Sequence, residues 1–426
     1  MEETHVVTFF LRNRTDVLLV RRSDAVGSYT GQWGAIAGHV APDPDAPAAE
    51  RDRDPDAAAH AEIAEEAGLA DAVTLVCRGE PFPVEDADLD TRWVVHPYLF
   101  DCDARTVTVD EETTECEWVS PTELLRRETV PDLWTSYDRV RPGVATVADD
   151  RTHGSAYLSL RALETLRDEA ALAVERDAGD WNTLAALARE LRTARPSMPV
   201  VANRVNRVMA AAVDDRTPAA VEAAATDIIT AAFDADDAAA ETAADRVAGD
   251  RLVTLSRSGT VREALARADP AAVLVAESRP GGEGVGVAES LTADGVDTTI
   301  TADAALAHEL ASGDWDAVLV GADTVLPDGR VVNKVGTRSL ALAAVREGVP
   351  VYVVAAVDKV ATDTEPHLED ADPAAVYDDD ADLHVTAPLF DETPADCVTG
   401  LCTEQGELDA EDIAAVAAEH RERAEW

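Results

Sequence analysis

The sequence predicts an α/β protein built from two unlike halves, and three patterns in the chain predict it. Short β-rich segments near the start, "HVVTFFL" and "DVLLVRR", precede an alanine-rich helical segment. Apolar residues then recur at helical spacing from about residue 156 to residue 248. Short valine-rich runs alternate with helical intervals after that, which is typical of a mostly parallel sheet covered by helices on both faces. We therefore expect domains at residues 1–143, 144–248 and 249–426.

The charge of the chain indicates a protein of a high-salt cytoplasm. It carries 84 acidic and 36 basic residues, a formal charge of -48 and a pI near 4.3. In about 1 M salt the Debye length falls to roughly 3 Å, so surface carboxylates stop repelling one another. Most acidic runs are therefore expected to be solvated surface. Direct binding of nucleic acid is not expected, because phosphate contacts need a basic patch.

Cysteine usage and hydropathy indicate a reduced protein that does not enter membranes. The five cysteines form no CxxC pair and leave an odd number, which argues against a disulfide framework or a zinc site. No apolar run approaches the roughly 18 residues that a membrane helix needs. We expect a cytoplasmic location.

The first half carries a carboxylate cluster on one predicted helix. The two opening strands form a hairpin around "RNRT", and "PDAAAHAEIAEEAGL" predicts a helix that Gly68 ends. Glu62, Glu65 and Glu66 stand at i, i+3 and i+4, so they share one face. Like charges held so close favour a hard cation such as Mg²⁺ or Mn²⁺. The alternative is a solvated acidic surface.

This half resembles the Nudix hydrolases. Gly38 matches the opening glycine of their signature, "AEIAEEAGL" matches its end, and "LLVRRS", "GQWGAIAGH" and "EETTECEWVSPTEL" resemble the flanks. The resemblance implies an α/β/α sandwich with a mixed sheet. It also implies that Glu62, Glu65 and Glu66 bind the metal, with Glu112 a further candidate ligand and Glu62 a candidate catalytic residue. The implied reaction is attack of water on the phosphoanhydride of a nucleoside diphosphate linked to another group.

Two departures from the signature bear on this activity. The family arginine that would orient Glu62 is Ala61 here, and the interval from Gly38 to Ala61 is longer than the family pattern. We expect the fold to be retained and hydrolysis to be impaired or altered.

The second half begins after a linker, residues 141–156. Helical segments lead into the predicted strands "RLVTLS", "AAVLVAES", "VDTTIT", "DAVLVGAD", "VPVYVVAAV" and "ADLHVTA". In parallel sheets, ligands collect beyond the carboxyl ends of the strands. The turns "SRSGT" and "ESRPGGEG" lie there, and Asp323 ends a strand there.

The chain contains two lysines, and both follow strands of this sheet. Lys334, after Asn333, is expected to open the helix that follows Asp323, and Lys359 follows "VYVVAAVD". An ammonium group is a good point charge for phosphate, and a Ser/Gly-rich turn at a helix N-terminus offers N–H groups to one. The sequence therefore predicts a site for an anion. The alternative makes Asp323 a loop or cap residue and the lysines surface remnants.

This half resembles the family that unites the regulatory subunits of translation initiation factor 2B with methylthioribose-1-phosphate isomerase and archaeal ribose-1,5-bisphosphate isomerase. The resemblance rests on "TLSRSGTV", "VAESRPGGEG", "VLVGADTVLPDGRVVNKVGTRSLALAA" and "PLFDETPADCVTGLCTEQG". It implies a Rossmann-like domain, a phosphorylated ligand, a homodimer, and, in one branch, initiation factor 2 as partner. In the isomerase branch Asp323 would be the acid–base, and Asn333, Lys334 and Lys359 would bind substrate.

Three positions depart from the isomerases. Their cysteine is Ser256, the glutamine after Arg-Pro is Glu283, and their Arg-Gly-Ala is His153-Gly154-Ser155. Serine does not form a thiolate, so chemistry is weakened more than binding. The alternatives are a binding regulator, which we favour, a divergent isomerase, and a scaffold with both sites inactive. The candidate residues are Asp323 and Ser256 for catalysis, and Ser258, Gly259, Thr260, Arg279, Glu283, Asn333, Lys334 and Lys359 for ligand binding.

Overall fold

The computed structural model describes residues 2–40, 54–64, 68–69, 72–108 and 111–426. Two compact units make up the chain. The N-terminal unit comprises residues 1–143 and 167–180, and the C-terminal unit comprises residues 144–166 and 181–426. No helix among the described residues is both long and apolar enough to cross a membrane.

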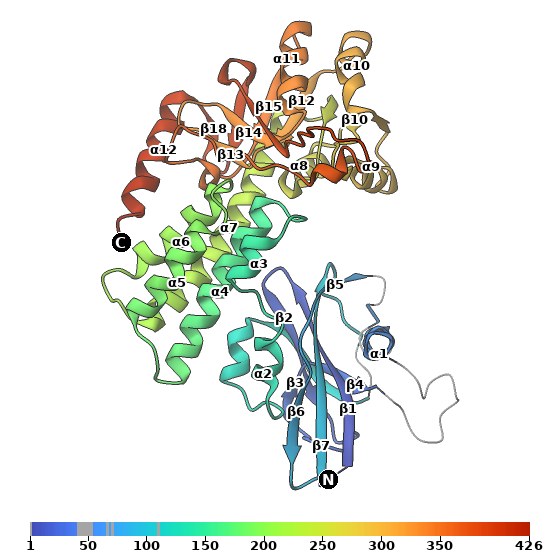
Figure 1. Cartoon of the computed structure of the whole chain (residues 1–426), viewed down its shortest axis with the longest axis vertical. Coiled ribbons are helices and arrows are strands. Elements are labelled where there is room, and N and C mark those ends of the chain that lie inside the picture. Colours follow the sequence, from blue (N-terminus) through green and yellow to red (C-terminus); the bar gives the residue numbers. More distant parts are fainter. Residues whose placement is uncertain (1, 41–53, 65–67, 70–71, 109–110) are drawn as a thin grey trace. The chain divides into compact units, whose positions relative to one another are not determined.

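The N-terminal unit is built on an eight-stranded mixed sheet (Figure 1). Its path runs β3-β2-β1-β7-β5, while β4 pairs with β1, β6 with β7 and β8 with β2. The long strands β1 and β7 are parallel and the other pairs are antiparallel. The strands are β1 (Glu2–Asn13), β2 (Asp16–Arg22), β3 (Trp33–Gly34), β4 (Ile36–His39), β5 (Val73–Arg78), β6 (Phe82–Asp86), β7 (Thr91–Cys102) and β8 (Thr113–Val119).

The predicted hairpin and sandwich are confirmed. Asn13 pairs with Asp16 across a two-residue turn, in which Arg14 takes the left-handed conformation that such turns need. Successive residues of β1 point into different cores on the two faces of the sheet. Phe9 packs with Ala59 of α1 (Pro55–Glu62), and Phe10 packs with Tyr137 of α2 (Leu133–Asp138). Helices therefore cover both faces of the sheet. The 3₁₀ helix η3 (Pro121–Leu125) adds to the second core.

The C-terminal unit begins with helices, as predicted. They are α3 (Val144–Asp149), α4 (Ser155–Glu175), α5 (Trp181–Ala194), α6 (Pro199–Ala212) and α7 (Pro218–Arg246), of which α4 passes into the N-terminal unit from residue 167. The expected linker over residues 141–156 therefore contains a short helix, α3. A six-residue helix has too few apolar positions to show a period in the sequence.

A seven-stranded sheet follows, in the order β11-β10-β9-β12-β15-β17-β18. Every pair is parallel except β17 with β18, so the predicted Rossmann-like fold is confirmed. The strand order reverses between β9 and β12, which makes their carboxyl ends the topological switch point. The strands are β9 (Arg251–Thr254), β10 (Ala272–Ala276), β11 (Thr298–Thr301), β12 (Ala317–Gly321), β15 (Val351–Val354), β17 (Gly400–Thr403) and β18 (Gly406–Leu408).

Helices cover both faces of this sheet (Figure 1). Successive strand residues alternate between the two cores, since Leu252 packs on the α7 side and Val253 on the α11 side. Apolar residues of α7, α8 (Gly259–Ala268) and α9 (Glu283–Ala293) fill the first core, and those of α10 (Leu306–Ser312), α11 (Thr337–Glu347) and α12 (Ala410–Arg423) fill the second.

A second, three-stranded sheet was not expected from the sequence. It joins β13 (Thr324–Val325), β14 (Val331–Lys334) and β16 (Phe390–Thr393) in antiparallel pairs. The predicted strand "ADLHVTA", residues 381–387, is wrong, because these residues form an irregular, largely exposed segment. Alternation over so few residues cannot distinguish a strand from a loop that packs at one or two positions.

Candidate functional site

One carboxylate of the predicted metal cluster is fixed by a close approach in the N-terminal unit. Glu62 is the last residue of α1, and a Cβ atom placed on Gly38 of β4 would lie 2.2 Å from its Oε1. Only glycine therefore leaves room for the Glu62 carboxylate against the sheet. The signature glycine and its glutamate are thus brought together by packing of α1 on β4.

The rest of the metal cluster is only partly visible. Helix α1 is α-helical to Glu62 and continues as a π-helical turn at Ile63 and Ala64, and Gly68 has a φ of +65°, as expected for the residue that ends the segment. Glu65 and Glu66 lie outside the described residues. Glu112 lies in the turn before β8, where its carbonyl accepts the N–H of Ser23 and the residue is exposed. Within the described ranges no three His, Cys, Asp or Glu residues form a group that could hold a metal.

In the C-terminal unit, two serines follow adjacent strands in a strained conformation. Ser256 after β9 has a φ of 65° and Ser278 after β10 has a φ of 67°. The Ser256 N–H donates to Ser278 Oγ at 2.7 Å, and Asp303 accepts the N–H of Ser278 at 2.8 Å. Left-handed residues other than glycine cost about 1–3 kcal/mol each and cluster at functional sites. Ser278 and Asp303 thus hold the turn that presents Ser256, and sequence reasoning missed both.

The predicted anion-binding turn lies at the switch point. Ser258 caps α8, accepting the N–H of Val261 at 3.3 Å, so Gly259 and Thr260 form the first turn of that helix. A Cβ on Gly321, at the end of β12, would lie 2.9 Å from Ser258 Oγ. The close approach at Gly321 therefore seats the helix N-terminus directly beside the strand end that leads to Asp323.

Asp323 is paired with the strand that carries Asn333 and Lys334. The N–H of Asp323 donates to the carbonyl of Val332 at 3.0 Å. Extending the β13–β14 register by one residue places Asp323 opposite Asn333. Asn333 and Lys334 were expected to open a helix, but they end β14, and α11 begins at Thr337. Their side chains consequently face opposite sides of a strand.

The buried Lys334 is matched by a carboxylate of the protein itself. Its ammonium lies 2.7 Å from Glu283 Oε1, at the first position of α9. Glu283 Oε2 is buried and forms no hydrogen bond with the described residues. Asn333 is buried too, but its amide donates to Thr337 Oγ1 at 3.0 Å. The Lys334 side chain therefore contacts Glu283, another predicted ligand-binding residue, whereas the Asn333 side chain stabilises the start of α11.

Lys359 is buried beside Asp323. Its ammonium donates to the carbonyl of Ala322 at 2.6 Å, and its charge interacts with that of Asp323. Burial lowers the pKa of Lys359, and the attraction of Asp323 partly offsets this effect. Both lysines of the chain are therefore buried, and Lys359 lies at the strand end that carries Asp323.

Arg279, a predicted ligand-binding residue, and His153, a position that departs from the isomerases, lie apart from the residues around Asp323. Arg279 is 69% exposed and its guanidinium pairs with Glu277 at 3.2 Å. His153 is exposed and pairs with Asp150 at 2.7 Å. Neither side chain is brought to Asp323 by a contact in the described part of the chain.

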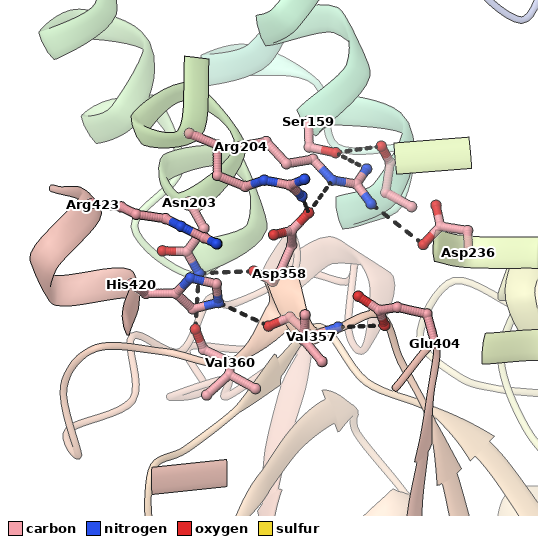
Figure 2. Close-up of polar contacts among 12 residues, drawn as sticks. Ser159, Asn203, Arg204, Asp236, Val357, Asp358, Val360, Glu404, His420 and Arg423 are labelled. Carbon is pink, nitrogen blue, oxygen red and sulfur yellow. Dashed lines mark hydrogen bonds and ion pairs between the residues drawn. The ribbon is translucent and has the colours of Figure 1, made fainter. Parts of the chain in front are cut away.

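A buried polar clamp fixes the turn that carries Lys359 (Figure 2). The turn is the 3₁₀ helix η5 (Val357–Lys359). Arg204 of α6 reaches Asp358 at 3.2 Å, and also Ser159 at 2.8 Å and Asp236 at 3.4 Å. Arg207 adds a second contact to Asp358 at 2.6 Å. Burial opposes ionisation of Asp358, but the two arginines outweigh it and hold its pKa below the usual value.

The backbone of the same turn is held from three further elements. Asn203 of α6 donates to the carbonyls of Asp358 and Val360 at 2.8 Å each. Glu404, after β17, accepts the N–H of Val357 at 3.0 Å, and His420 of α12 contacts the Val357 carbonyl at 3.0 Å. The sequence signal for the clamp was the presence of Asn203 and Arg204 on an otherwise apolar helical face. Periodicity alone does not predict which residues these two side chains contact.

Breaking the clamp should destabilise the C-terminal unit. Arg204→Met leaves Asp358 buried with one partner fewer, and loss of a buried partner costs about 3–5 kcal/mol. Urea unfolding in molar KCl measures this loss. Arg267→Met, which removes exposed contacts with Glu263 and Asp237, is the matched control and should cost less than about 1 kcal/mol. Equal losses in the two variants would contradict a structural role for the clamp.

The clamp also predicts a pH effect on stability. Burial lowers the pKa of His420 below its ordinary value of 6.5, so the unfolded chain binds a proton that the folded chain does not. The free energy of unfolding should therefore fall as the pH is lowered from about 6.5 towards the folded pKa. His420→Gln should flatten this part of the curve, measured by urea unfolding between pH 7.5 and pH 5.5, values set by the ordinary pKa of about 6.5. An unchanged slope would show that His420 is not responsible.

Comparison with known proteins agrees with this architecture. The NUDIX domain matches residues 1–140 and the Initiation factor 2 subunit family matches residues 151–410. A ribose 1,5-bisphosphate isomerase of Haloferax volcanii is 32% identical over 305 residues, which cover 65% of this chain and 92% of the relative. The enzyme of the same name from Haloterrigena turkmenica is 32% identical over 320 residues, covering 66% and 94%.

A solved structure described as translation initiation factor eIF-2B of Pyrococcus horikoshii OT3 has a TM-score of 0.53 and 25% identity. It covers 62% of this chain and 94% of its own. The segment that the family model matches, residues 151–410, contains the switch point, both lysines and the pair of Arg204 and Asp358. The chain therefore belongs to the initiation factor 2 subunit family, and it carries a NUDIX domain fused ahead of that family's domain.

Proposed function

We propose that the C-terminal unit binds a phosphorylated sugar or nucleotide at the switch point of its sheet. The observation that carries this proposal is the buried ammonium of Lys359 beside Ala322 and Asp323, together with the buried ammonium of Lys334 at the end of β14, where it pairs with Glu283. In a chain with a charge of -48, buried ammonium groups at this place are best explained by an anion. The N-terminus of α8, with Ser258, Gly259 and Thr260, supports it by offering backbone N–H groups to a phosphate.

A second candidate function is aldose–ketose isomerisation at the same site. Its support is Asp323, a half-buried carboxylate beside a buried lysine, together with the relatives named ribose 1,5-bisphosphate isomerase. Asp323 would move a proton between neighbouring carbons of the opened sugar. Ser256 cannot supply a thiolate, so this activity is expected to be slow. A binding role in regulation remains our first choice.

One set of variants separates the two candidates. Lys334→Met and Lys359→Met should weaken binding of ribose 1,5-bisphosphate about tenfold or more, because each removes a charge that faces the phosphate. Calorimetry in molar KCl measures this. Asp323→Asn should leave binding within about threefold and abolish any conversion to the ketose. Unchanged affinity in both lysine variants would contradict the binding proposal, and turnover that survives Asp323→Asn would contradict the isomerase.

For the N-terminal unit we propose metal-dependent hydrolysis of a phosphoanhydride. Glu62, Glu65 and Glu66 would hold Mg²⁺ or Mn²⁺, because a set of carboxylate oxygens suits a hard cation, and Glu112 is a further candidate ligand. The bound metal would clamp the phosphates and activate water. The placement of Glu62 against Gly38 supports the proposal. Ala61 leaves Glu62 without the orienting arginine of the family, so the rate is expected to be low.

Replacement of the described carboxylate tests this activity. Glu62→Gln keeps the size of the side chain at Gly38 but removes its charge, so Mg²⁺-dependent hydrolysis should fall about 100-fold or more. Chromatography of the products from a panel of nucleoside diphosphate compounds measures the rate. Glu115→Gln, which removes an exposed partner of Arg21, should leave the rate unchanged. Equal rates in the wild type and Glu62→Gln would exclude the metal role.

We further propose a homodimer formed through the C-terminal unit, a high-salt cytoplasm as its location, and initiation factor 2 as a partner of the regulatory form. The acidic composition and the five free cysteines support the location. The family assignment supports the dimer and the partner.

A further inference from the structure

The anion beside the buried ammonium of Lys334 is a carboxylate of the chain itself. Lys334 is 3% exposed, and its Nζ lies 2.7 Å from Glu283 Oε1. The turn before α9 leaves room for this carboxylate, because a Cβ atom placed on Gly281 would lie 2.8 Å from both of its oxygens. The isomerases that this half resembles have glutamine at this position. Glu283 therefore occupies the place beside Lys334 that a ligand phosphate would take.

The two turns that carry this pair are filled in the same way. In the turn after β10, which leads to Glu283, Asp303 accepts the N–H groups of Ser278 and Arg279 at 2.8 and 2.7 Å. After β14, Asp391 of β16 accepts the N–H of Gly336 at 2.8 Å, where α11 begins. Backbone N–H groups of this kind can bind a phosphate, but here carboxylates of the chain already accept their hydrogen bonds.

The N-terminus of α8 differs from these turns. Gly259 and Thr260 open the helix, and their N–H groups have no acceptor in the part of the chain that the structure describes. This end of α8 approaches Gly321 closely, and the buried Lys359 donates to the carbonyl of the next residue, Ala322. A phosphate at the end of α8 would therefore meet free N–H groups close to a buried ammonium.

The second oxygen of Glu283 indicates which ligand group lies next to it. Oε2 is buried and accepts no hydrogen bond from the described residues. A buried acceptor without a donor costs free energy until a donor meets it. A sugar hydroxyl is such a donor, whereas a phosphate at neutral pH brings acceptor oxygens and negative charge. The ligand group that suits Glu283 is therefore a hydroxyl.

We propose that Glu283 determines the specificity of the C-terminal site by rejecting a second phosphate. The site takes a sugar with one phosphate, which binds at the N-terminus of α8, and with a hydroxyl that donates to Glu283 Oε2. The second phosphate of a sugar bisphosphate has to displace Glu283 from Lys334 or lie against its negative charge, so a bisphosphate binds less well. The inference rests on the binding function stated under Proposed function. It distinguishes this chain from the relatives named ribose 1,5-bisphosphate isomerase.

Exchange of the carboxylate for an amide tests this role. Ribose 1-phosphate, ribose 5-phosphate and ribose 1,5-bisphosphate are titrated into the full chain by calorimetry in molar KCl. The wild type should bind one of the monophosphates at least as tightly as the bisphosphate. Glu283→Gln keeps an acceptor for Lys334 but removes the charge, so it should shift the ratio of the two affinities about tenfold or more towards the bisphosphate. Adding Lys334→Met should remove this shift, because the gain depends on the released ammonium.

Glu277→Gln is the matched control, since it removes a carboxylate of the same turn that pairs with the exposed Arg279. Its affinity ratio should stay within about twofold of the wild-type ratio. An equal shift in both variants, or no shift in a Glu283→Gln variant with unchanged thermal unfolding, overturns the role of Glu283. A wild type that binds the bisphosphate about tenfold more tightly than either monophosphate overturns that role but keeps the binding function. Absence of binding by all three compounds overturns the binding function, and the inference with it.

Discussion

The buried ion pair of Arg204 and Asp358 is the constraint on which the C-terminal unit depends. Both side chains are completely buried, and an unpaired charge at either position would remove a large part of the free energy of unfolding. The pair therefore forces α6 to meet the turn after β15. Because Lys359 follows Asp358 directly, the same contact fixes the buried ammonium beside Asp323. A single electrostatic requirement thus connects the helical part of the unit to the edge of the sheet where ligands are expected.

The two buried lysines of this acidic chain distinguish the candidate site of the C-terminal unit. Lys334 is held by Glu283 and Lys359 by a backbone carbonyl, so both stay in place without a ligand. Glu283 then competes with any incoming anion for Lys334. A ligand phosphate gains less from Lys334 than from an unpaired lysine, which favours selective over tight binding.

Several features could be read from the sequence because they depend on local patterns. Periodicity located α4 to α7 and the parallel strands. The turn "RNRT" marked the hairpin and Gly68 the end of the α1 segment, and strand ends pointed to Asp323, Ser256 and both lysines. Short motifs identified both resemblances. The short helix α3, the second sheet and the irregular segment at residues 381–387 were missed, because elements of so few residues leave no period to detect.

The sequence by itself determined the fold class, the acidic surface and the chemistry of the candidate residues, because these follow from residue type and spacing. Only the tertiary structure decided their partners. It placed Lys334 on Glu283 rather than in a free pocket, turned the Asn333 side chain towards α11, and left Arg279 at the surface. It also brought Arg204 to Asp358 across 154 residues of chain. Such pairings depend on how elements distant in sequence pack, and no local pattern records that geometry.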